Sequence, residues 1–260
     1  MAYENFNMNP TMQIPVSEFE LDVQRGKHSA RSLVSKFGQN LDIETAAPEV
    51  VWDGGATGLT FPTTAATLTI VSASAQDAAA GTGFSQIKIF GLDGNYNEIN
   101  ETVNMNGTNA VTTTNSYIRC FRAYGTAIGS GATAPAANAG NITIKHGSDL
   151  LAQITAGKGQ TLMAVYTIPA GKSGYAKSMY ASIRGGTSGR SADINMYIKD
   201  LAGVKRTLRD FGIHNTGNSF PIFPLDFSKI DEKTDIWVEA NVSAAATDIS
   251  AGFTLHIVDN

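Results

Sequence analysis

The sequence predicts an all-β protein with two β-sandwich or jelly-roll-like domains and an extended N-terminal arm. Turn signals recur at roughly ten-residue spacing, and the segments between them form short runs of alternating apolar and polar residues. No sustained helical periodicity exists outside residues 28–38. With 260 residues, the chain is long enough to form two domains of about 120 residues each.

We divide the predicted fold into an arm at residues 1–16, an N-terminal β-domain at 17–147 and a C-terminal β-sandwich at 148–260. The arm contains two prolines, Pro10 and Pro15, and too few apolar residues to fold alone. One interpretation is a disordered tail. The other is a segment that docks on a neighbouring chain through its apolar residues, which are Phe6, Met8, Met12 and Ile14.

The N-terminal half begins with two short elements. Residues 17–26 alternate apolar and charged side chains and predict a strand, whereas residues 28–38 have the spacing of one or two helical turns. Residues 41–62 predict a short strand that a Gly turn closes, with Trp52 buried in the core. Residues 66–73 predict the next strand.

A predicted antiparallel meander covers residues 85–125. Ile87 and Ile89 alternate with polar residues, and residues 93–95 (Asp-Gly-Asn) supply a tight reversal. A second strand follows with Ile99, Val103 and Met105 on one face, and a third strand ends in the run Tyr117–Gly125, which contains Arg119 and Cys120.

The C-terminal half repeats the same pattern of strands and turns. Residues 161–168 lead into a turn at 169–174 and return as a strand at 175–184, which predicts a hairpin. The remaining predicted strands or extended segments are 141–145, a strand within 147–159, 193–199, 203–213, 220–227, 235–242 and 251–258.

No motif in the sequence predicts catalysis or a cofactor. Residues 171–173 (Gly-Lys-Ser) resemble the end of a phosphate-binding loop, but Tyr166 occupies the position that requires Gly. The four histidines lack metal-ligand spacing, and Cys120 is expected to be a small buried residue. Glu98 and Glu101 would face opposite sides of a strand, and the acidic cluster at residues 231–235 fits a solvated turn.

Charge is sparse and unevenly distributed. Charged residues make up 16% of the chain and the net charge is −4, which argues against general nucleic-acid binding. Residues 172–209 contain eight basic and two acidic residues. These basic residues are either scattered on solvent-facing sides of strands or form a cationic patch for an acidic partner. The partner-binding candidates are Arg184, Arg190, Lys205 and Arg206.

The sequence gives two expectations about cellular location. No apolar run approaches the roughly 18 residues that span a bilayer, so we expect no membrane association. The first sixteen residues lack the basic start and apolar stretch of a signal peptide. We therefore expect synthesis in the cytoplasm of a host.

Several segments resemble virion structural proteins of tailed phages, particularly short-tailed marine phages that infect cyanobacteria. The resemblance rests on phrases such as VSKFGQNLDIETAAPEVVWDGG and IFGLDGNYNEINETVNMNG, and it spans most of the chain. The segments are residues 34–55, 89–107, 114–125, 138–144, 161–175 and 233–259.

This resemblance implies a non-enzymatic virion component, most directly a capsid decoration or cement protein that binds the outer surface of a phage head and stabilises it. The implied partners are the major capsid protein or other virion proteins, together with further copies of this chain, expected as a homotrimer. The alternative is a head-fibre, knob or tail-associated host-recognition module, in which loops such as 126–140 and 185–190 bind a cell-surface glycan.

Overall fold

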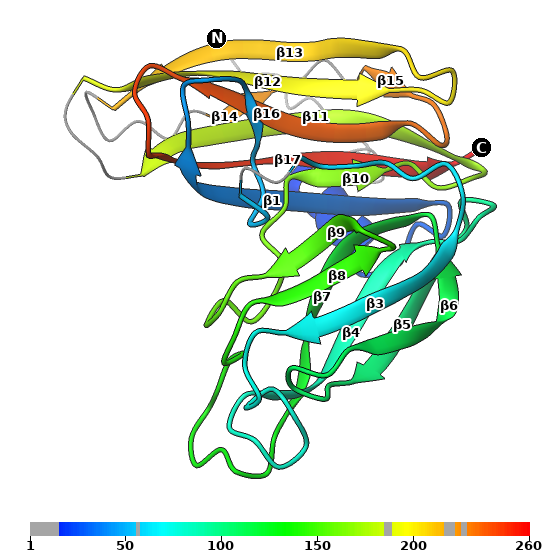
Figure 1. The fold of residues 1–260 in the computed structure, drawn as a ribbon. Coiled ribbons are helices and arrows are strands. Elements are labelled where there is room, and N and C mark those ends of the chain that lie inside the picture. The colour runs from blue at the N-terminus through cyan, green and yellow to red at the C-terminus, as the bar shows by residue number, and fades with distance from the viewer. Residues whose placement is uncertain (1–15, 56–57, 185–188, 216–221, 225–227) are drawn as a thin grey trace, which may run out of the picture.

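The computed structural model describes residues 16–55, 58–184, 189–215, 222–224 and 228–260 (Figure 1). Within these ranges the chain forms one α-helix, α1 (Val16–Gln24), and seventeen strands in four antiparallel sheets. The prediction of an all-β protein is confirmed. No helix in the described part of the chain is long and apolar enough to cross a membrane.

Two of the sheets form the upper layer pair in Figure 1, which we call the terminal unit because both ends of the described chain lie in it. One sheet has the order β1 (Arg31–Ile43), β17 (Thr247–Asp259), β11 (Lys172–Arg184) and β14 (Ile222–Pro224), and β15 (Lys229–Ile230) also pairs with β11. The other has the order β10 (Val165–Thr167), β16 (Asp235–Val242), β12 (Ser191–Lys199) and β13 (Lys205–His214), and β2 (Glu49–Val50) also pairs with β16.

The other two sheets form the lower part of the molecule in Figure 1, which we call the inserted unit because it occupies the chain between β2 and β10. One sheet has the order β6 (Val111–Tyr117), β3 (Ala66–Ser72), β8 (Ile142–His146) and β9 (Asp149–Ile154). The other has the order β5 (Glu98–Asn104), β4 (Phe84–Leu92) and β7 (Arg119–Ile128).

Each unit buries its own hydrophobic core. In the terminal unit, residues of β1, β11 and β17 pack against residues of β10, β12 and β16, and in the inserted unit β3, β8 and β9 pack against β4, β5 and β7. Trp52 is fully buried in the core of the inserted unit, as the sequence predicts. Trp237 of β16 extends that core toward the terminal unit.

This packing corrects the predicted division of the chain at residues 147 and 148. These two residues lie in the turn between β8 and β9, which pair with each other along their length. Strand β1 pairs with β17, the last strand of the chain, so residues from both predicted domains share one sheet. The units are therefore an insertion, with crossings near residues 52 and 163, rather than two consecutive domains.

The two chain crossings between the units pair with each other. Asp53 N donates to the carbonyl of Leu162 at 3.0 Å, and Ala164 N donates to the carbonyl of Val51 at 3.1 Å. Strand β1 passes these two paired segments so closely that a Cβ atom at Gly38 would lie 2.0 Å from the Val51 oxygen. Glycine at this position allows the close approach of three segments.

Two predictions near the N-terminus are wrong. Residues 17–24 lie in α1 instead of a strand, and residues 31–38 form part of β1 instead of helical turns. Phe19 and Val23 are four residues apart and share one helical face, whereas Leu21 between them is 54% exposed. Pairing with β17 outweighs the weak helical spacing of the next segment, because it supplies a continuous ladder of backbone hydrogen bonds.

The predicted meander is partly confirmed. β4 and β5 form the expected hairpin, and Asp93 Oδ1 accepts hydrogen bonds at 2.8 Å from the backbone of Asn95 and Asn97. The residue with positive φ in this turn is Tyr96, not the neighbouring Gly or Asn. The third predicted strand divides at Ile118, because β6 pairs with β3 and β7 pairs with β4.

The hairpin predicted across residues 161–184 does not form. β10 pairs with β16, and β11 pairs with β17, so the two strands lie in different sheets of the terminal unit. The turn before β11 therefore connects one sheet to the other, and Gly171 adopts a φ of +71° there. This arrangement confirms that the Gly-Lys-Ser sequence leads into a strand rather than a phosphate-binding helix, since Lys172 and Ser173 begin β11.

Candidate functional site

A buried ion pair joins the inserted unit to the terminal unit. Arg119, the first residue of β7, faces Asp235, the first residue of β16. Its Nε atom lies 2.6 Å from Oδ1 and its Nη2 atom lies 2.9 Å from Oδ2, which is a bidentate geometry. The side chains are only 8% and 2% exposed. The sequence analysis placed Asp235 in a solvated turn, and the structure corrects this.

Further contacts complete the hydrogen bonding of this pair. Arg119 Nη1 donates to the carbonyls of Pro62 at 2.6 Å and Ile118 at 2.8 Å. Thr167 Oγ1 donates to Asp235 Oδ1 at 2.7 Å, and the ammonium of Lys199 lies 3.6 Å from Oδ2. Every polar atom of the carboxylate is therefore occupied, which makes Asp235 a structural anchor rather than an acid or base.

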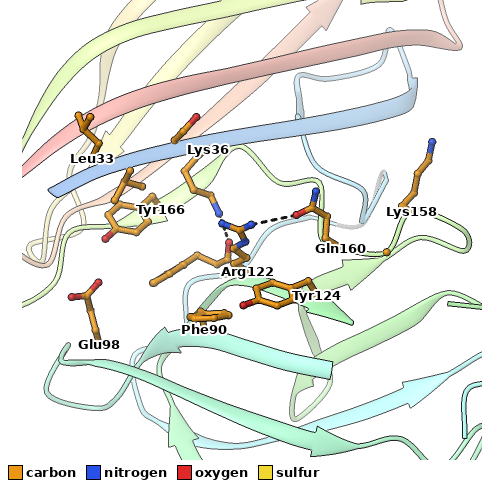
Figure 2. A pocket seen from close by; sticks show the side chains of 13 residues that line it. Leu33, Lys36, Phe90, Glu98, Arg122, Tyr124, Lys158, Gln160 and Tyr166 are labelled. Carbon is orange, nitrogen blue, oxygen red and sulfur yellow. Dashed lines mark hydrogen bonds between the residues drawn. The ribbon is translucent and has the colours of Figure 1, made fainter. Parts of the chain in front are cut away.

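An open cleft of about 770 Å³ lies between the two units (Figure 2). Residues 33–36 of β1 form one wall, and β4, β5 and β7 contribute the opposite wall. Residues 158–160, which precede the second chain crossing, and Tyr166 of β10 complete the lining. Figure 2 shows the guanidinium of Arg122 directed toward Lys36 and Gln160, and its Nη2 atom lies 3.5 Å from Gln160 Oε1.

Lys36 has an unusual environment in this cleft. Its Nζ atom donates a hydrogen bond to the carbonyl of Phe121, and its side chain is buried. Burial lowers the pKa of Lys36 to about 7, and the positive charge of Arg122 adds to this effect. Nearby, burial raises the pKa of the Asp53 carboxyl to about 7, although hydrogen bonds from the backbone oppose the shift.

The thiol of Cys120 is buried, as the sequence analysis expects. Burial raises its pKa to about 12, which keeps the thiol protonated at neutral pH. A protonated, buried thiol does not act as a nucleophile.

Glu98 and Glu101 do not form a carboxylate pair. Glu98 lies 3.5 Å from the ammonium of Lys172, whereas Glu101 accepts hydrogen bonds from the backbone of Thr114 at 2.7 Å and Asn115 at 2.9 Å. Glu101 thus connects β5 to β6, across the edges of the two sheets of the inserted unit. In the described part of the chain, no three His, Cys, Asp or Glu residues are grouped so that they could hold a metal ion.

The predicted arm residues Phe6, Met8, Met12 and Ile14 lie outside the described residues. Helix α1, which follows the arm, is attached to the terminal unit. Glu20 forms an ion pair with Lys177 of β11, and the Arg31 guanidinium lies 5.7 Å from the ring centroid of Phe19.

The four predicted basic residues do not form one patch. Arg184 ends β11, and Arg190 precedes β12 and donates to the Ala246 carbonyl at 2.6 Å. Lys205 and Arg206 begin β13, which pairs with the other end of β12, roughly 25 Å away along the strand. Lys205 pairs with Glu239 at 3.1 Å and Arg206 with Asp200 at 3.3 Å, so two of these four charges are paired with carboxylates of the same chain.

The sequence analysis did not predict the buried ion pair, which forms the joint between the two units, or the cleft. The ion pair joins residues 116 positions apart, and the cleft combines side chains from both units. The only sequence signal for either was the alternation in β7, which places Arg122 and Tyr124 on the same face of the strand.

No protein-family model matches the sequence, and no curated protein is significantly similar to it. Three solved structures that align with the chain come from infectious bursal virus, also named infectious bursal disease virus. One, from derived T=1 particles, has 12% identity, a TM-score of 0.26, and coverage of 89% of this chain and 70% of the other. The Gx strain structure has 11% identity, a TM-score of 0.26, and coverage of 88% and 72%. The VP2 subviral particle has 9% identity, a TM-score of 0.23, and coverage of 88% and 72%. TM-scores this low do not establish a common fold.

Proposed function

We propose that this chain is a non-enzymatic structural protein of a tailed-phage virion, and that it decorates the outer surface of the head and stabilises it. The observation that carries the proposal is the position, in the fold, of the segments that resemble tailed-phage virion proteins. Residues 34–55 and 161–175 contain both chain crossings, and residues 114–125 and 233–259 contain the two partners of the buried ion pair. The resemblance thus covers the framework that joins the two units rather than isolated loops.

The described residues support a binding role instead of a catalytic one. Asp235 is held in an ion pair, Glu101 accepts backbone hydrogen bonds, and the Cys120 thiol stays protonated. A protein that stabilises a shell works by bridging neighbouring subunits through large interfaces, which requires a rigid body and attachment points. The paired chain crossings and the buried ion pair supply the rigid body.

The proposed attachment point is the N-terminal arm. Phe6, Met8, Met12 and Ile14 would each contribute roughly 1–3 kcal/mol on full burial against a neighbour, before the entropic cost of ordering the arm. The basic residues Arg184, Arg190, Lys205 and Arg206 are the secondary candidates for contact with the major capsid protein. The low charged fraction of 16% also favours self-association, which we propose to be trimeric.

Deletion of residues 2–16 tests this proposal. Full-length protein and the deletion variant are mixed with heads assembled without this chain, and binding is measured by sedimentation while head stability is measured by heating. We expect the variant to retain the far-ultraviolet circular dichroism of the β-fold but to bind less and to protect less. A variant that carries Ser at all four apolar arm positions should behave like the deletion.

Two results would contradict the proposal. Equal binding and equal thermal protection by the deletion variant would remove the arm from the mechanism. A density map of the virion that places this chain on a tail or fibre, and not on the head, would favour the host-recognition alternative.

A further inference from the structure

The lining of the cleft between the units contains more cationic than anionic side chains, and the buried Asp53 carboxyl, outside this lining, favours the charged form of Lys36. Its lining contains three cationic side chains, Lys36, Arg122 and Lys158, and one carboxylate, Glu98. Glu98 already lies 3.5 Å from the ammonium of Lys172. Among the described residues, the three cations have no carboxylate within ion-pair distance, so the cleft has a positive excess.

Two of these cations repel each other. The positive charge of Arg122 is one of the causes that lower the pKa of Lys36, and the Phe121 carbonyl that accepts the Lys36 hydrogen bond carries no full charge. An anion in the cleft would offset this repulsion and favour the charged amine. The charge distribution of the cleft is therefore complementary to an anionic ligand.

Aromatic side chains form much of the remaining surface. Phe90 and Tyr124 stack with their ring centroids 5.4 Å apart, and Phe121 lies 4.8 Å from Tyr166. The guanidinium carbon of Arg122 is 5.4 Å from the Tyr124 centroid, so the cation lies beside an aromatic ring, and its planar N–H groups can donate to a carboxylate. Apolar rings beside oriented donors suit a ligand that has both apolar ring faces and polar groups.

We propose that this cleft binds a short saccharide that carries carboxylate groups. The carboxylate accepts hydrogen bonds from Arg122 and Lys158, a sugar ring packs against Phe90 and Tyr124, and its hydroxyl groups bond to Gln160. The volume of about 770 Å³ falls within the range of small-ligand pockets, about 300–1,000 Å³, and is too small for a folded protein surface. An acidic peptide would satisfy the charges but offers fewer ring faces to the aromatic side chains.

Isothermal titration of the full chain with trigalacturonate tests the proposal. The matched probe is fully methyl-esterified trigalacturonate, which keeps the three rings and removes the charges. We expect trigalacturonate to bind, and its methyl ester to bind at least about tenfold more weakly. Arg122→Gln should lose about tenfold or more in affinity for trigalacturonate. Arg25→Gln, at an exposed arginine that directly follows α1 and lies outside the cleft, should leave the affinity unchanged.

Several outcomes would overturn the inference. They are no binding of trigalacturonate, equal binding of its methyl ester, or an Arg122→Gln variant that folds and binds as tightly as the native chain. Equal or tighter binding of tetraglutamate at the same residues would identify an acidic-peptide site instead. Binding of trigalacturonate only after deletion of residues 2–16 would assign the cleft to the arm. Apart from that last result, these outcomes do not bear on attachment to the head, which is measured separately by sedimentation.

Discussion

Substitution of Asp235 by Asn removes the counter-charge of Arg119 at the joint between the two units. The pair is bidentate, with donor–acceptor distances of 2.6 and 2.9 Å, and Asp235 is 2% exposed. Loss of one partner of a buried ion pair costs about 3–5 kcal/mol, because the remaining charge stays buried without compensation. That loss is a large fraction of the roughly 5–15 kcal/mol by which a domain is stable.

The surrounding contacts place the expected loss near the lower end of that range, about 3 kcal/mol. Arg119 retains its hydrogen bonds to the carbonyls of Pro62 and Ile118, and its guanidinium stays 5.2 Å from the Phe61 ring. Lys199, which also loses the carboxylate, is 28% exposed and can be hydrated. Urea titrations followed by circular dichroism and by tryptophan fluorescence measure the change, since Trp237 lies in the same strand as Asp235.

A double-mutant cycle with Arg119→Met separates the pair from its surroundings. The double variant should lose less than the sum of the two single variants, because each single variant leaves one charge unpaired. Asp200→Asn is the control, since Asp200 pairs with Arg206 at 3.3 Å on an exposed strand and should cost less than about 1 kcal/mol. Additivity within about 0.5 kcal/mol, or equal losses for Asp235→Asn and Asp200→Asn, would refute the reasoning.

Two other predictions concern β1. Lys36→Met should raise the free energy of unfolding by about 1 kcal/mol or more at pH 6, where the native chain must bury a charged amine whose pKa is lowered to about 7. Between pH 7 and 10 the Lys36 amine is protonated in the unfolded chain but not in the folded chain, so the stability of the native protein rises with pH over that range. The stability advantage of Lys36→Met over the native chain should therefore shrink as the pH rises. A gain that is the same at every pH in urea titrations would contradict this. Gly38→Ala should lower the free energy of unfolding by about 1–3 kcal/mol in the same assay, because the new Cβ would lie 2.0 Å from the Val51 oxygen. Gly58→Ala is the control, since a Cβ there meets open space. Equal losses of stability in the two variants would contradict the prediction.

The features that the sequence predicted correctly are those that depend on local chemistry. The β4–β5 hairpin follows from alternating residues on both sides of Asp93, whose carboxylate caps the turn. Trp52 was expected in the core because a large apolar residue follows a short apolar strand. The prediction for the N-terminal segment failed because Phe19 and Val23, four residues apart, share a face in both a strand and a helix, and only Leu21 favoured the strand.

The features that the sequence did not predict depend on pairing between distant segments. Nothing near β1 indicates that its partner is the last strand of the chain, so a division at residue 148 was the simplest interpretation. Asp235 was read as a turn residue because its neighbours are charged, yet β7 brings Arg119 to it from 116 positions away. The composition of a segment describes its solvent preference, whereas an ion pair of this kind depends on the fold.

The joint and the cleft depend on the same strand. In β7, Arg119 reaches Asp235 in the terminal unit, and three residues later Arg122 enters the cleft opposite β1. The walls of the cleft come from different units, so their separation is set by whatever fixes those units to each other. The paired crossings at Val51–Asp53 and Leu162–Ala164 fix one side, and the buried ion pair fixes the other. A binding site between two units keeps its shape only when such a joint is rigid, which gives the costly burial of Arg119 and Asp235 a functional reason beyond stability.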